Sequence, residues 1–145
     1  MKIAIGTNKF LGHLEMIKDL LTDLQYEIID VNNKVPKDIF DASFEVAKLV
    51  NDHQADRGII IDEFGNGGFM VAAKFKNNIV AQLSDEHSAH MTREHNNANI
   101  ITLGAELTGD EALKAIVTRY FATEFAGGRH LVRTDMLGEL LKEEQ

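Results

Sequence analysis

Two short, continuous apolar runs constrain the fold of this chain more than any other feature of its sequence. Ile59-Ile60-Ile61 and Ile100-Ile101 lack the polar residue at every second position that marks a strand with one face in water. Runs of this kind fit strands that are buried on both faces, and such strands belong to parallel sheets covered by helices on each side. The two runs therefore predict an α/β protein.

Amphipathic stretches separate the apolar runs along the whole chain, which is typical of βαβ units. We expect strands at 2–6, 26–31, 58–62, 79–83 and 100–103. We expect helices at 10–24, 38–51, 67–75, 84–96, 109–121 and 131–142, with Ser84 and Asp85 as candidate N-caps and Pro36 in a loop. The sequence thus predicts a three-layer α/β/α Rossmann-like sandwich with a five-stranded parallel sheet.

Length and composition fit one soluble domain. The 145 residues are enough for one core, and the apolar content of 44% and charged content of 26% are ordinary. Without a linker or an internal repeat, residues 1–145 are expected to form a single domain. No apolar run reaches the ~20 residues that span a bilayer, and the first residues do not read as a signal peptide. We therefore expect a cytoplasmic protein without membrane contact. The absence of cysteine excludes disulfides and a thiolate catalyst within the chain.

The net charge of −8 restricts the class of ligand. Non-specific nucleic-acid binding depends on neutralising phosphates with basic residues, so an acidic chain of this kind is not expected to bind nucleic acid. A small phosphorylated ligand needs only a local basic cluster. Arg129, His130 and Arg133 form such a cluster after the Gly127-Gly128 hinge, and the two arginines share a helix face at a spacing of four. The alternative is a solvated surface paired with Glu124 or Asp135.

Ligands of open parallel sheets gather at the carboxyl ends of the strands, which here are residues 6–9, 62–68, 83–85 and 104–106. Asp62 and Glu63 end the third strand, either as a base or ligand-orienting pair or as polar residues that cap a turn. The next segment is Gly65-Asn66-Gly67-Gly68. It forms either an anion-binding nest or a plain strand-to-helix turn. It lacks the lysine and spacing of a Walker A loop.

Three histidines lie in the segment expected to be helical at 84–96. His87 and His90 are three residues apart and could share a metal ion, but no cysteine or HExxH pattern supports a metal site, and we expect none. His95-Asn96 closes the segment just before a strand. It is either a helix cap or a polar cluster that faces the site.

Taken together, these segments resemble the ribose-5-phosphate isomerase B family, which includes both subunits of galactose-6-phosphate isomerase. The resemblance covers essentially the whole chain and is carried by residues 2–6, 61–74, 84–99 and 127–133. Within the family the chain is most similar to the A-type subunit of the galactose-6-phosphate enzyme, with Asp62 in place of a cysteine and with Phe69-Met70-Val71-Ala72 among the signals.

The resemblance implies a function and residue roles. Family members interconvert aldose and ketose phosphates through a cis-enediolate, without a metal or organic cofactor. Carried over residue by residue, the resemblance implies that the glycine loop stabilises an oxyanion and that His95 opens the sugar ring. It also implies residues that bind the substrate and its phosphate: Asn8, Lys9, Gly65, Asn66, Gly67, Asn96, Arg129, His130 and Arg133. It also implies dimers or tetramers with sites shared across the interface, and a C-terminal helix that packs on a neighbouring subunit.

Three departures from the family pattern lead to the expected division of labour. Asp62 stands where many relatives have a cysteine base, Phe64 where they have a hydroxyl, and Asn8-Lys9 where active homomeric relatives have an Asp-His pair. The expectation is therefore an A subunit that converts galactose 6-phosphate and tagatose 6-phosphate with a homologous B subunit supplying the base. The alternatives are a homomeric isomerase that uses Asp62 or Glu63 as base, and an inactive homologue that binds a sugar phosphate.

Overall fold

The two apolar runs form central strands of a five-stranded parallel sheet. β3 (Arg57–Asp62) and β5 (Ile100–Gly104) are buried along almost their whole length. The other strands are β1 (Lys2–Thr7), β2 (Glu27–Asp30) and β4 (Val80–Leu83), in the order β2-β1-β3-β5-β4. The computed structural model describes residues 1–33 and 38–140, so the loop around Pro36 and the end of the last expected helix lie outside it.

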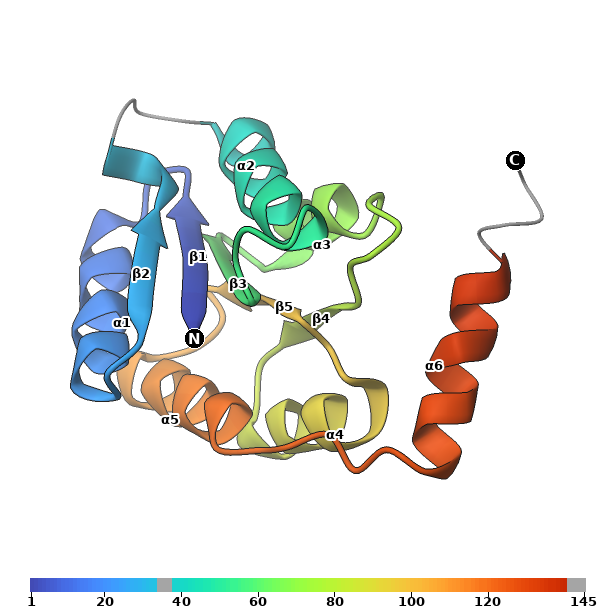
Figure 1. Cartoon of the computed structure of the whole chain (residues 1–145). Coiled ribbons are helices and arrows are strands. Elements are labelled where there is room, and N and C mark those ends of the chain that lie inside the picture. Colours follow the sequence, from blue (N-terminus) through green and yellow to red (C-terminus); the bar gives the residue numbers. More distant parts are fainter. Residues whose placement is uncertain (34–37, 141–145) are drawn as a thin grey trace.

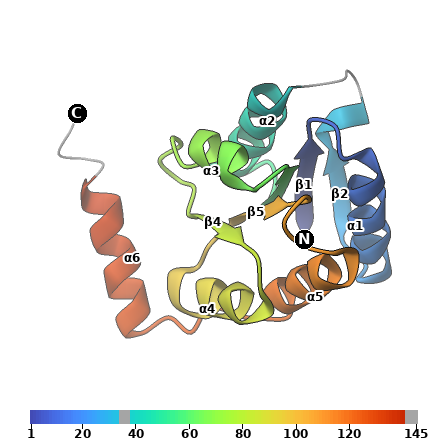
Figure 2. The ribbon, with the colours of Figure 1, turned by 180° about the vertical axis from the view of Figure 1, so that it is seen from behind.

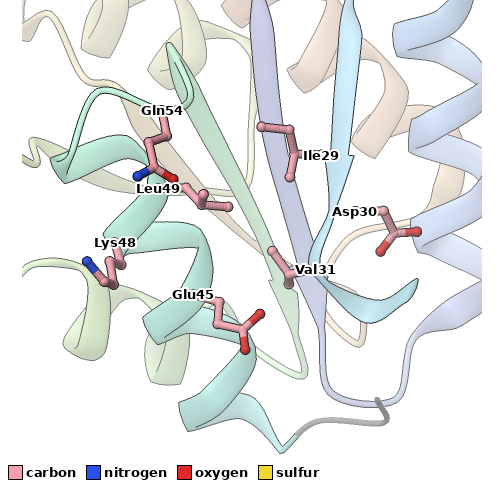
Figure 3. A pocket seen from close by; sticks show the side chains of 7 residues that line it. All are labelled: Ile29, Asp30, Val31, Glu45, Lys48, Leu49 and Gln54. Carbon is pink, nitrogen blue, oxygen red and sulfur yellow. The ribbon is translucent and has the colours of Figure 1, made fainter. Parts of the chain in front are cut away.

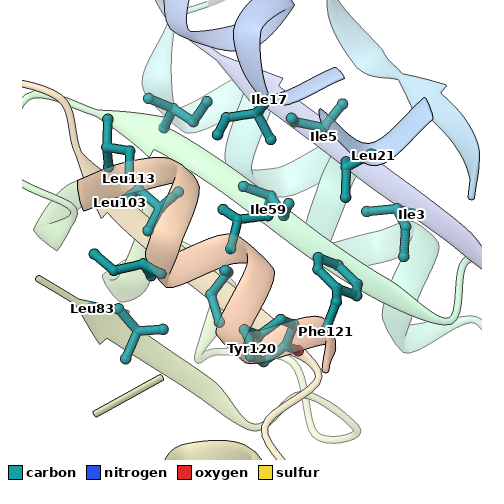
Figure 4. Packing of buried hydrophobic residues seen from close by; sticks show 14 of the residues in the cluster. Ile3, Ile5, Ile17, Leu21, Ile59, Leu83, Leu103, Leu113, Tyr120 and Phe121 are labelled. Carbon is teal, nitrogen blue, oxygen red and sulfur yellow. The ribbon is translucent and has the colours of Figure 1, made fainter. Parts of the chain in front are cut away.

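Helices cover both faces of this sheet, as Figures 1 and 2 show. One face carries α1 (Leu11–Asp23), α4 (Glu86–Asn96) and α5 (Asp110–Phe121), and the other carries α2 (Ile39–Asn51) and α3 (Asn66–Ala72). Successive side chains of a strand point to opposite faces. Ile59 and Ile61 therefore enter the larger hydrophobic cluster (Figure 4), whereas Ile60 enters the smaller one. The predicted three-layer sandwich is confirmed.

The expected elements are all present, with small differences at their ends. The second strand stops at Asp30 because Val31–Asn33 forms a short 3-10 turn, and the helix expected at 67–75 runs from Asn66 to Ala72. Of the two candidate caps, Asp85 is the N-cap of α4, since its Oδ1 accepts the Ser88 N–H at 2.7 Å.

The last helix, α6 (Arg129–Leu140), stands apart from the sheet beside the end of α4 (Figures 1 and 2). Gly127 and Gly128 both have positive φ angles, 64° and 55°, a region that glycine adopts most readily, so they form the turn before α6; a hinge at this point stays a prediction. Five large apolar side chains of α6 are exposed: Leu131, Val132, Met136, Leu137 and Leu140. Its packing on a neighbouring subunit stays a prediction. No helix within the described residues is long and apolar enough to cross a membrane.

The strand order decides where the carboxyl-end loops meet. The chain moves outward from β1 to β2 and then returns to the other side of β1 to form β3. The connections leave β1 and β3 in opposite directions, which opens a crevice at this switch point. Residues 8–9 and 62–68, which follow β1 and β3, therefore lie next to each other.

Candidate functional site

The Asp62 carboxylate turns back into its own loop. Only 2% of the residue is exposed, and its Oδ1 accepts the N–H groups of Phe64, at 3.0 Å, and of Gly65, while Oδ2 accepts that of Gly68 at 2.8 Å. The side chain therefore holds the turn in shape, which is the capping alternative. Within the described residues, the N–H groups of Asn66 and Gly67 have no acceptor, so they are the loop donors left for an anion.

The glycines of this loop are required by its close packing. Gly65 has a φ of 79°, in the left-handed region. A Cβ on Gly68 would lie 2.5 Å from Cγ2 of Ile60, and a Cβ on Gly104 would lie 2.8 Å from the Phe64 carbonyl carbon. Side chains at these positions would push the loop off the sheet, so the glycines place its backbone close to β3 and β5.

Lys9 and Asn8 are joined to Glu63 across the switch point. Lys9 Nζ lies 2.7 Å from Glu63 Oε1, and Asn8 Nδ2 donates to the same carboxylate at 3.3 Å. The hydrogen bond from Lys9 is the main reason that the pKa of Glu63 is lowered, and the same contact raises the pKa of Lys9. A carboxylate with a lowered pKa is a weaker base, which argues against Glu63 as the general base.

His95 and His130 form the core of a second cluster. Their rings are stacked, with centroids 4.2 Å apart and planes 7° from parallel. His130 is 8% exposed, and burial followed by the charges of His95, Arg129 and Arg133 lowers the pKa of its imidazole. The lowered pKa favours the neutral imidazole of His130, which packs against the ring of His95.

A hollow of about 370 Å³ lies between the end of α4 and α6, and four of the predicted site residues line it. They are His95, Asn96, His130 and Arg133. Arg129 is exposed one residue before His130 and acts on the pKa of that imidazole. An imidazole pair beside an amide and two guanidinium groups is suited to a hydroxylated molecule that carries a phosphate.

These two groups of predicted residues lie at opposite ends of the sheet. The Asp62 loop follows the carboxyl end of β3, where Asp62 pairs with Gly104 of β5. α4 runs back along the sheet and ends at Asn96, just before β5 begins at Ile100. The four steps from Ile100 to Gly104 cover roughly 13 Å at the usual rise per strand residue. One chain therefore does not bring its glycine loop to its own His95.

Sequence reasoning missed Glu94 as a member of the histidine cluster. Its Oε2 lies 3.3 Å from His90 Nε2 and 3.4 Å from His95 Nε2, so one carboxylate orients both rings. The spacing indicated this contact, since Glu94 follows His90 by four helical positions and adjoins His95.

In residues 1–33 and 38–140, no group of three or more histidine and acidic side chains could hold a metal ion, so the metal alternative for His87 and His90 gains no third ligand.

Another hollow, of about 290 Å³, opens on the edge of the sheet between β2 and α2 (Figure 3). Its charged lining residues are Asp30, Glu45 and Lys48, and Asp30 accepts a hydrogen bond from Lys18 at 2.8 Å. None of the predicted site residues lies there. The candidate site therefore consists of the glycine loop at one end of the sheet and the histidine–arginine cluster at the other.

The chain is similar to known proteins over almost its whole length. The model of a family described as Ribose/Galactose Isomerase matches residues 3–137. The galactose-6-phosphate isomerase subunit LacA 2 of Streptococcus pyogenes is 45% identical, and subunit LacA of Staphylococcus aureus is 43% identical; each alignment covers 97% of this chain and 99% of the relative. The solved ribose-5-phosphate isomerase B of Clostridium thermocellum superposes with a TM-score of 0.93 at 34% identity and full coverage of both chains. That of Mycoplasma genitalium, with bound ribulose-5-phosphate, gives 0.92 at 30% identity, covering 98% of this chain and 97% of that one.

Proposed function

Because this chain belongs to the ribose/galactose isomerase family, we propose that it is the A subunit of a heteromeric galactose-6-phosphate isomerase. The reaction is the interconversion of D-galactose 6-phosphate and D-tagatose 6-phosphate. Full-length similarity to subunits of that enzyme supports the substrate, and the two-ended arrangement of the candidate site supports the need for a second chain.

The observation that carries the proposal is the separation of the glycine loop from the histidine–arginine cluster. A base at the end of β3 and a ring-opening histidine at the end of α4 serve one substrate only when they come from different subunits. In this chain the residue at the end of β3 is Asp62, whose carboxylate oxygens already accept three loop N–H groups. The partner, a homologous B subunit, therefore supplies the base next to His95 of this chain.

The chemistry needs few groups from this chain. Arg129 and Arg133 bind the 6-phosphate through charge-assisted hydrogen bonds, with His130 beside them. His95, oriented by Glu94, moves a proton between the ring oxygen and the C1 hydroxyl as the sugar opens, and Asn96 binds a hydroxyl of the chain.

The isomerisation follows on the open-chain sugar. The partner's base takes the proton from C2 and returns it to C1, while a hydroxyl proton passes from O2 to O1. Backbone N–H groups of a glycine loop stabilise the enediolate oxygen that develops between these steps. In this chain, Asn66 and Gly67 have N–H groups free for that role within the described residues. A second kind of site would combine the glycine loop of this chain with the histidine of the B subunit. That site would have no base at the end of β3, because this chain has Asp62 there.

Exposed apolar side chains offer surface for the subunit contacts that such a site requires. Those of α6 lie beside the histidine–arginine cluster. Phe40, Phe44, Phe69 and Met70 are exposed on α2 and α3, next to the glycine loop. Large exposed apolar patches on a folded chain mark interaction sites. We infer that both regions are covered in the heteromer, and that the isolated chain forms homodimers or tetramers through them.

The test is to assay this chain alone and mixed with a B subunit. We expect activity on galactose 6-phosphate from the mixture and little or none from the pure chain. His95→Gln in this chain should abolish the activity of the mixture, whereas His87→Gln, at the exposed start of the same helix, should leave it within a few-fold. Full activity of the pure chain would contradict the division of labour, and loss of that activity with Glu63→Gln or Asp62→Asn would favour a homomeric enzyme.

A further inference from the structure

Two arginines outside the candidate site line one pocket, and within the described residues neither forms an ion pair. Arg57 begins β3 and Arg93 lies on α4, and both line a polar hollow of about 540 Å³ at the amino ends of the strands. Its other polar lining residues are Asp56, Asn77, Asn97 and Asn99. This pocket is neither the glycine loop nor the hollow between α4 and α6.

The guanidinium groups are held in place by an aromatic floor. The Cζ atom of Arg57 lies 5.3 Å from the ring centroid of Tyr120 and 5.7 Å from that of Phe121. The Cζ atom of Arg93 lies 5.8 Å from the same Tyr120 ring. Figure 4 shows the two aromatic side chains at the end of α5. Tyr120 is fully buried, and its hydroxyl donates to the Ala98 carbonyl at 2.7 Å.

Neither arginine has a carboxylate within ion-pair distance in the part of the chain that the structure describes. Arg93 is 4% exposed and uses Nη1 to donate to Asn97 Oδ1 at 2.9 Å and to the Ala98 carbonyl at 2.7 Å. Its Nε and the Nη1 of Arg57 are buried without an acceptor. The nearby Asp56 carboxylate accepts the Lys2 N–H at 2.6 Å.

Such an arrangement is costly unless an anion completes it. Burial, and then the charge of Arg57, lowers the pKa of Arg93, while Tyr120 and Glu124 act in the opposite direction, so the two guanidinium charges repel each other across the pocket. Unpaired buried donors and uncompensated buried charges are rare because each costs more free energy than a satisfied group. Planar guanidinium forks match the oxygens of a phosphate or a phosphate ester.

We propose that the Arg57–Arg93 pocket binds a small oxyanion of the phosphate class, as a site separate from Arg129 and Arg133. The pocket is large enough for a phosphorylated metabolite. The Nδ2 groups of Asn77 and Asn99 already donate to backbone carbonyls, so the side-chain donors for the ligand are the two guanidinium groups and the Asn97 amide. This inference does not rest on the proposed isomerase activity.

Inorganic phosphate is the probe, titrated into the full chain against sodium chloride of equal ionic strength. We expect the Nε–Hε NMR signals of Arg57 and Arg93 to shift with phosphate and not with chloride. The double variant Arg129→Gln/Arg133→Gln should keep these shifts and a phosphate-dependent rise in melting temperature. Arg57→Gln added to that double variant should weaken phosphate binding about tenfold or more, because a charge-assisted hydrogen bond is lost.

Arg57→Lys is the matched control, because it keeps the charge and loses only the fork, and it should recover part of the affinity. The inference is overturned if saturating phosphate leaves the Arg57 and Arg93 signals of the unmodified chain in place. It is equally overturned if the double variant loses all phosphate response. Since the first measurement uses the unmodified chain, a variant that fails to fold does not rescue the proposal.

Discussion

The imidazole rings of His95 and His130 stack in parallel, 4.2 Å apart, and tie the start of α6 to the end of α4. Both rings line the hollow that Asn96 and Arg133 also line. At this contact, burial and then the neighbouring charges lower the pKa of His130, which favours the neutral form of its imidazole.

The first prediction concerns the lowered pKa of His130. NMR titration of the imidazole signals should show His130 protonating below the ordinary histidine value of about 6.5. Because the unfolded chain then binds its proton first as the pH falls, the free energy of unfolding should decrease from pH 6.5 down to the pKa of the folded state. His95→Gln should raise the pKa of His130 by removing one repulsive neighbour.

His87→Gln is the control for that titration, since His87 lies at the exposed start of α4 and is not among the causes of the His130 shift. It should leave the pKa of His130 unchanged. A His130 that titrates at or above 6.5 would show that the stacked, buried arrangement is wrong.

The second prediction concerns the close packing of α3 on β3. In Gly68→Ala the new Cβ would meet Ile60 Cγ2 at 2.5 Å, so the free energy of unfolding should fall by about 1–3 kcal/mol. The matched control is Gly12→Ala on α1, where nothing lies within 4 Å; alanine should be neutral or add up to about 1 kcal/mol there. Urea denaturation of both variants measures the difference, and equal effects would argue against the observed packing.

The third prediction separates a structural from a catalytic Asp62. Asp62→Asn places an NH₂ group against a loop N–H, which leaves buried donors unpaired and should cost about 1–3 kcal/mol of stability. The same change at exposed Asp19 should stay within about 0.5 kcal/mol. If Asp62→Asn removed all isomerase activity with unchanged stability, the residue would be the base after all.

The fourth prediction addresses the phosphate. In the mixture with a B subunit, Arg133→Gln should raise KM for galactose 6-phosphate about tenfold or more, because a charge-assisted contact worth about 1.5–3 kcal/mol is removed. Arg119→Gln, an exposed arginine on α5, should leave KM unchanged. Equal KM values for the two variants would assign the phosphate to other residues.

Much of the fold was predictable from the sequence because it depends on local patterns. The apolar runs at 59–61 and 100–101 identified the buried strands, and the spacing of apolar residues identified the helices between them. The two adjacent glycines, Gly127 and Gly128, indicated a break before the last helix, and both have positive φ angles in the turn that precedes α6. The ends of β2 and α3 were missed by a few residues, because the turns there depend on contacts that a local pattern does not contain.

The sequence by itself determined the α/β class, the glycine loop, and the residue types that resemble a sugar-phosphate isomerase. Only the tertiary structure decided which of those residues meet. It turned Asp62 into its own loop, paired Glu63 with Lys9, and placed His95 at the far end of the sheet from Gly65–Gly67. The physical reason is that strand order and helix direction set these distances through long-range pairing, whereas spacing along the chain reports only on neighbours.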